Sequence, residues 1–205
     1  MASTATPYGF RAVNELGGLP YAGSTRQFLI NPAGYNTNIF NGSIVAINTS
    51  GFLEIVTTNG DNSTAFPAGT IGVFVGCSYV NSQGQVIYAQ FYPANYVAPA
   101  GTAITAYVID DDRAVFQVQS AGSVTQAAVG ANVFFTTSAV ATGSTSTGNS
   151  TASVVAGSSA VTTTAAFRVV GFVNMQGFSV VGDAYTDILV KINPGYHTFT
   201  NAVGL

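Results

Sequence analysis

With 205 residues, the chain is long enough to bury a substantial hydrophobic core without disulfides or a structural metal ion. It has eight Asp and Glu, five Lys and Arg and 47% hydrophobic residues, a composition that excludes an intrinsically disordered protein. Five basic residues cannot form the basic face that nucleic-acid binding requires, and no apolar run approaches the roughly 18 residues of a membrane span, so we expect neither partner.

The low charge also bears on assembly. Charged side chains normally keep the surface of a monomer soluble, and here they make up 6% of the chain. The surface must therefore depend on Ser, Thr, Asn and Gln or be covered by neighbouring subunits, which predicts a homo-oligomer. The start of the chain, MASTATPYGF, has neither a basic nor an apolar signal-peptide region, so we expect synthesis in the cytosol without secretion.

Residues 1–26 are predicted to form an extended N-terminal arm. The segment is rich in Gly, shows no clear periodicity and has many apolar side chains for a terminal segment. Either it packs on its own domain, or its side chains dock on a neighbouring subunit or on another partner. The candidate contact residues in the arm are Tyr8, Phe10, Arg11, Leu16, Leu19 and Tyr21.

Residues 27–205 are predicted to form a single β-domain, an antiparallel β-barrel or sandwich with little helix. Lys, Glu, Met and Leu are scarce, whereas short runs of Val, Ile, Thr, Tyr and Phe alternate with Gly, Asn, Pro and Ser clusters. The segment 124–131 (VTQAAVGA) is the one plausible helical turn. The expected strands are 27–30, 43–48, 52–57, 72–80, 85–92, 104–109, 115–119, 167–173 and 188–192.

The stretch 103–119 (AITAYVIDDDRAVFQVQ) is predicted to be a β-hairpin. Its first part is β-branched and aromatic, its last part alternates apolar residues with amides, and Asp110, Asp111 and Asp112 supply turn chemistry between them. A second hairpin is expected at 72–92, where Asn81 to Gly84 link two alternating runs.

The segment 138–164 is nearly pure Ala, Ser, Thr, Gly and Val. One interpretation is a flexible linker. The other is a pair of thin strands around the turn 147–150, because Val140, Val154, Val155 and Val161 interrupt the polar residues.

Residues that could carry chemistry are few. Cys77 lies in a strand-like run, so we expect a buried structural thiol. His197 is the single histidine, and we expect it to be solvated or loosely hydrogen-bonded. No nucleophile elbow or phosphate-binding loop is present, and one His and one Cys cannot form a zinc or iron site. The sequence therefore predicts no enzyme, no cofactor and no metal.

The acidic residues leave two alternatives open. The three turn aspartates could join Asp183 and Asp187, with Asp61 as a further candidate, around a hard cation such as calcium. The same residues with Glu54 could supply a carboxylate pair for glycoside hydrolysis. We favour a structural role in the turn, because Asp commonly stabilises turns through nearby backbone amides.

Several short sequence segments, in their order along most of the chain, resemble the sequences of a family of head decoration proteins of tailed, especially short-tailed, bacteriophages. These segments are TPYGFRAVNELGGLPYAGSTRQFLI at the start, VIDDDRAVFQVQ in the centre, then STSTGNSTASV and FRVVGFV, and finally YTDILVKIN followed by His197.

The resemblance implies a cement protein that binds the outer surface of an expanded capsid. Its partners would be the major capsid protein and its own copies, in a trimer by the symmetry of local threefold positions. It would be made in the host cytoplasm and become part of the virion. The alternative function is a tail-associated or fibre-associated β-sandwich module that binds host glycans through Tyr and Phe rings.

Overall fold

The computed structural model describes residues 4–57, 70–136, 143–156, 165–175 and 178–200. Within them the chain is all-β: two antiparallel sheets pack as a sandwich, and neither sheet closes into a barrel. The helical elements of these residues are two 3-10 turns, η1 (Gln126–Ala128) and η3 (Pro194–Tyr196), and η1 lies in the segment expected to be helical. No helix in the described ranges is long and apolar enough to cross a membrane.

Sheet A contains five strands in the order β1-β8-β11-β10-β9. The N-terminal strand β1 forms one edge by pairing with β8, with Arg11 opposite Gln117. The prediction missed β1 and the two-residue strand β9, because neither has the alternating apolar pattern of a longer strand. The bounds are β1 (Arg11–Glu15), β8 (Ala114–Gln119), β9 (Asn132–Val133), β10 (Phe167–Phe172) and β11 (Asp187–Ile192).

Sheet B contains six strands. Its order is β2-β7-β5-β3-β4, and β6 pairs with the far end of β5 beyond β3. The β5-β6 hairpin was predicted, and Asn81 fixes its turn by accepting hydrogen bonds from the backbone N–H groups of Gln83 and Gln85 at 3.0 and 2.9 Å. The bounds are β2 (Arg26–Ile30), β3 (Ile44–Ile47), β4 (Leu53–Ile55), β5 (Thr70–Val80), β6 (Val86–Ala89) and β7 (Ile104–Ile109).

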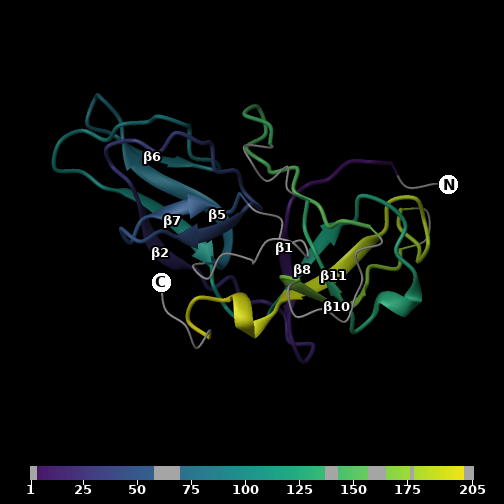
Figure 1. The fold of residues 1–205 in the computed structure, drawn as a ribbon. Helices are drawn as coiled ribbons and strands as arrows, with labels where there is room; N and C mark the ends of the chain where they lie inside the picture. Colours follow the sequence, from purple (N-terminus) through teal and green to yellow (C-terminus); the bar gives the residue numbers. More distant parts are fainter. Residues whose placement is uncertain (1–3, 58–69, 137–142, 157–164, 176–177, 201–205) are drawn as a thin grey trace.

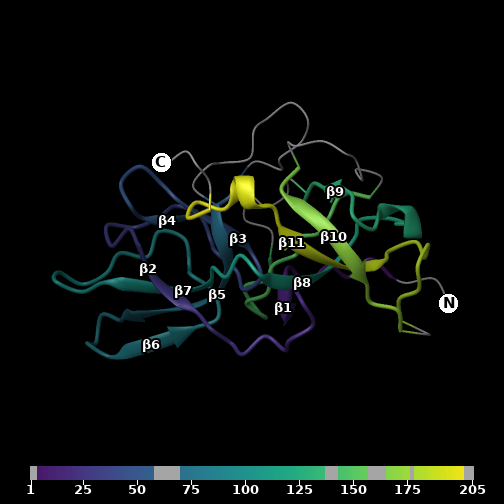
Figure 2. The same cartoon turned by 90° about the horizontal axis from the view of Figure 1, so that it is seen from below.

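The predicted hairpin at 103–119 is wrong. Its first strand, β7, pairs with β2 and β5 in sheet B, whereas its second, β8, pairs with β1 and β11 in sheet A. The three aspartates therefore lie in a crossover between the sheets, visible between the β7 and β8 labels of Figure 2. Turn residues specify where the chain bends. They do not specify which strand the chain pairs with after the bend, because that depends on which sheet edge lies nearby.

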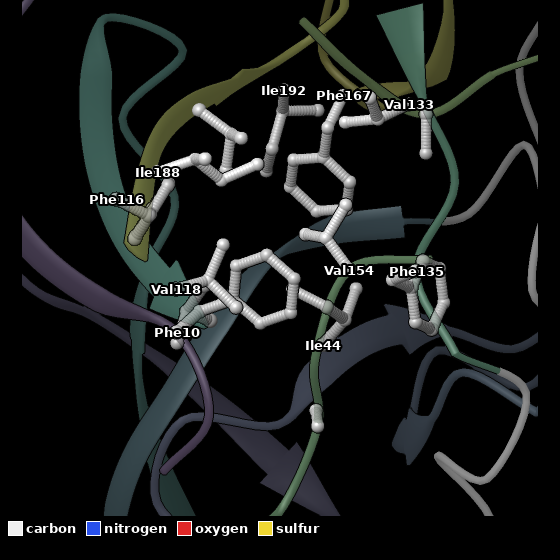
Figure 3. Close-up of a cluster of buried hydrophobic side chains, with 14 of the residues drawn as sticks. Phe10, Ile44, Phe116, Val118, Val133, Phe135, Val154, Phe167, Ile188 and Ile192 are labelled. Atoms are coloured by element: carbon white, nitrogen blue, oxygen red, sulfur yellow. The ribbon is translucent and has the colours of Figure 1, made fainter. Parts of the chain in front are cut away.

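The sheets share one core. Alternate residues of β3 and β5 point from sheet B toward sheet A, and they pack on the apolar side of β8, β10 and β11. At the centre the ring of Phe10 stacks on Phe167, with ring centroids 4.8 Å apart, and Phe135 meets both rings edge-on. Figure 3 shows these rings with Ile44, Val118, Val154 and Ile188 around them.

The segment 143–156 contributes to this core. Gly143 and Ser150 form an antiparallel bridge around the predicted turn, and Val154 is fully buried between Ser120 and Phe135. The linker interpretation is therefore wrong for this part of the chain. Residues 137–142 and 157–164, with Val140 and Val161, lie outside the described residues.

The opposite side of sheet B has its own core of Ile, Val, Phe and Tyr side chains, among them Ile30, Phe74 and Tyr92. Because sheet A covers only the inner end of sheet B, the two sheets lie side by side along the molecule in Figure 1 and Figure 2. The outer part of the side facing sheet A stays uncovered. We call this part the open face; none of its residues is buried, and they are Gln27, Leu29, Ser78, Val80, Val86, Tyr88, Thr105 and Tyr107.

Candidate functional site

The first candidate residues belong to the N-terminal segment, which is anchored on its own domain. Phe10 is 1% exposed in the inter-sheet core. The Tyr8 hydroxyl donates a hydrogen bond to Asp187 Oδ1 at 3.1 Å and accepts one from Gln117 at 2.9 Å, while the Arg11 guanidinium lies 4.8 Å above the Tyr8 ring. Burial, followed by the negative charge of Asp187, raises the pKa of Tyr8. Phe10 and Tyr8 therefore pack on their own domain, whereas Arg11 is exposed.

Leu16 and Leu19 are placed differently. They lie on a tight turn after β1 in which Glu15 N–H donates to Leu19 O and Leu16 N–H donates to Arg113 O, both at 2.7 Å. The side chains of the two leucines are 43% and 60% exposed. An ordered turn therefore presents two apolar side chains to solvent.

The three aspartates lie in an acidic corner with Arg26, His197 and Phe199, around a cleft of about 390 Å³. The Arg26 guanidinium pairs with the Asp110 carboxylate at 2.9 Å and lies 4.9 Å from the centre of the Phe199 ring. Asp111 accepts the backbone N–H of Arg113 at 2.8 Å, which is the turn role favoured for these residues. Asp112 is exposed.

His197 is buried, which corrects the expectation of a solvated side chain. Its Nε2 lies 2.8 Å from the Asp110 carbonyl oxygen, and its Nδ1 accepts the Phe199 N–H at 3.3 Å. These contacts are those of a neutral ring that donates through Nε2, so the imidazole fixes the chain after β7. No residue pattern predicts this contact, because 87 residues separate the two partners.

The other acidic candidates lie elsewhere. Asp187 bonds to Tyr8, and Asp183 accepts the backbone N–H of Val180 at 2.9 Å. No group of three or more His, Cys, Asp or Glu in the described part of the chain is placed to hold a metal ion. Asp61 lies outside that part. Cys77 is buried as expected, and burial raises the pKa of its thiol to about 12.

A second cleft, of about 460 Å³, lies where the two sheets meet and was not predicted. We call it the junction cleft. It is lined by Val75 and Ile109 of sheet B, by residues of the N-terminal segment and by residues of loops far apart in sequence. Its polar wall residues are Arg11, Tyr21, Asn41, Gln90 and Asn149.

Tyr21, the last candidate of the arm, is half-buried in the wall of the junction cleft and packs against the inter-sheet core. Its hydroxyl donates to the Ser24 carbonyl. Burial raises the pKa of Tyr21, and the carboxylates of Asp111, Asp110 and Glu15 raise it further.

Comparisons of the chain with family models, with curated proteins and with solved structures gave no match.

Proposed function

We propose that this protein is a structural virion component that binds the outer surface of an expanded phage capsid and stabilises it. The sequence segments that resemble decoration proteins, and their order along the chain, support this proposal. One structural observation supports it as well. The Leu16 and Leu19 side chains are exposed on a turn that backbone hydrogen bonds hold in place. Exposed apolar side chains that lie together on an ordered turn can mark a protein contact.

In this proposal the turn contacts the major capsid protein or a neighbouring copy, and assembly as a trimer repeats the contact. A trimer at a local threefold position offers the same patch to equivalent capsid subunits. Because each contact is small, the overall affinity comes from valency.

Co-sedimentation of the purified protein with expanded capsids that lack it tests the proposal. We expect saturable binding at a ratio of copies to capsid subunits that is fixed by the lattice. The absence of bound protein, with the folded oligomer in the supernatant, would refute the proposal and favour a location on the tail.

The variant L16S/L19S tests the turn itself. We expect it to lose capsid binding while its thermal unfolding stays unchanged, because both side chains are exposed. The matched control is Val129→Ser, which removes an exposed apolar side chain beside η1. Deletion of residues 2–20 would be a poor test, because it removes β1 and Phe10 from the fold.

A further inference from the structure

We propose that the junction cleft binds a neutral oligosaccharide. The volume of the cleft, about 460 Å³, lies within the roughly 300–1,000 Å³ of small-molecule sites. Its lining combines apolar residues of the core with polar residues from several segments. The inference is independent of capsid binding, because it depends on the chemistry of this cleft and of the open face.

The amide side chains of the wall match hydroxyl groups. Gln90 Nε2 donates to Asn149 Oδ1 at 2.9 Å, and Asn41 Nδ2 donates to the Val75 carbonyl at 3.1 Å. In these bonds Gln90 Oε1, Asn149 Nδ2 and Asn41 Oδ1 are not used, and Gln90 is exposed to solvent. A sugar hydroxyl donates and accepts, so it can bond to these oxygens and to this N–H group.

One tyrosine, Tyr21, lines the cleft, and two more, Tyr107 and Tyr88, lie on the open face. On β7, Tyr107 lies two residues before Ile109, which lines the cleft together with Tyr21. The Tyr107 hydroxyl bonds to Ser78 Oγ at 3.1 Å, and Ser78 pairs with Tyr88, whose ring is 77% exposed. Such rings offer apolar faces for the C–H side of a sugar ring, with a polar hydroxyl at the edge.

The charge distribution selects for a neutral ligand. Residues 27–53 and 62–109, which include Val75 and Ile109 of the cleft lining and nearly all of sheet B, contain no Asp, Glu, Lys or Arg. Among the described residues that line the cleft, Arg11 is the one with a charge, and its guanidinium already lies over the Tyr8 ring. An anionic or cationic ligand would therefore meet few side chains of opposite charge among the described residues of the cleft.

A second copy of the chain fits this surface less well. Four strands spaced about 4.8 Å apart, with four residues of about 3.4 Å in each, give the open face a footprint of roughly 260 Å². A stable protein interface buries about 800 Å² per partner. An extended peptide would gain hydrogen bonds at a strand edge, whereas this face offers side chains only.

The test is an NMR titration of the full-length protein with neutral tetrasaccharides of glucose, mannose and N-acetylglucosamine. We expect resonances of the junction cleft to shift at millimolar sugar. A flat titration with all three sugars, or binding only to sialylated or sulfated oligosaccharides, would overturn the proposal. A dimer that forms through this face and hides the cleft would overturn it too.

Matched variants locate the site. We expect Gln90→Ala or Asn149→Ala to weaken binding roughly five- to tenfold, the effect of losing about one hydrogen bond. The control Gln83→Ala removes the same amide from the exposed β5-β6 turn and should leave the affinity unchanged. Tyr88→Ala should weaken binding, and Phe178→Ala, with a ring that is equally exposed elsewhere, should not. Equal losses in the variants and their controls would contradict the assignment.

Discussion

Phe10 shows how far the N-terminal segment belongs to the domain. Its ring is 1% exposed and contacts Phe167 and Phe135 in the inter-sheet core. We expect Phe10→Ala to lower the free energy of unfolding by about 3–5 kcal/mol, because the removed ring leaves a cavity. Urea unfolding measures the change. The control Phe178→Ala, in an exposed loop, should stay within about 0.5 kcal/mol of the parent, and an equally small change for Phe10→Ala would contradict the packing.

Asp187 makes stability depend on pH. Burial raises its pKa above the ordinary 3.8, and the hydrogen bond from Tyr8 offsets part of that rise. A raised carboxyl pKa means that the native state binds the proton more tightly than the unfolded state. The stability that this proton contributes is present below 3.8 and is lost as the pH rises through the raised pKa of the native state.

We therefore expect Asp187→Asn, which cannot ionise and keeps an acceptor for Tyr8, to gain stability relative to the parent as the pH rises. Urea unfolding at neutral pH and at a pH below 3.8 measures the difference in the free energy of unfolding between variant and parent at each pH. If the free energy of unfolding of the parent instead rises relative to that of Asp187→Asn as the pH rises, the Tyr8 hydrogen bond outweighs the effect of burial on Asp187.

Strand β5 contributes side chains to both cores, and at Gly72 its backbone lies close to the end of β7. A Cβ at Gly72 would lie 1.9 Å from the carbonyl oxygen of Ile109, and its φ of +154° is unfavourable for other residues. We expect Gly72→Ala to lower the free energy of unfolding by more than about 2 kcal/mol, because the obstructing atom is backbone.

Gly195→Ala is the matched control for Gly72→Ala. A Cβ at Gly195 meets no atom within 4 Å, and the residue lies in η3. Urea unfolding of both variants makes the comparison, and equal stability for the two would contradict the backbone geometry of β5.

For the molecule as a whole, the shortage of charge sets the expected assembly. We expect a homo-oligomer at micromolar concentration whose mass in light scattering stays the same from low salt to about 1 M salt, where the Debye length is about 3 Å. Contacts between weakly charged surfaces depend on apolar burial, which salt does not screen. A monomeric mass, or an oligomer that dissociates as salt rises, would contradict this expectation.

The strands of sheet B and the fold class follow from local chemistry. The β-branched and aromatic runs of 72–80 and 104–109, with turn residues such as Asn81 between runs, leave few alternatives to an antiparallel all-β fold. Burial of Cys77 follows in the same way. Each of these properties depends on neighbours within a few positions of the chain, and residue patterns record such neighbours.

Only the tertiary structure placed the crossover at the three aspartates, the burial of His197 and the junction cleft. Asn41, Gln90 and Asn149 come from three distant loops, and each alone is an ordinary polar residue. They meet because sheet A covers only the inner end of sheet B. That offset is set by the packing of Phe10, Phe167 and the shared core, and no local pattern encodes it.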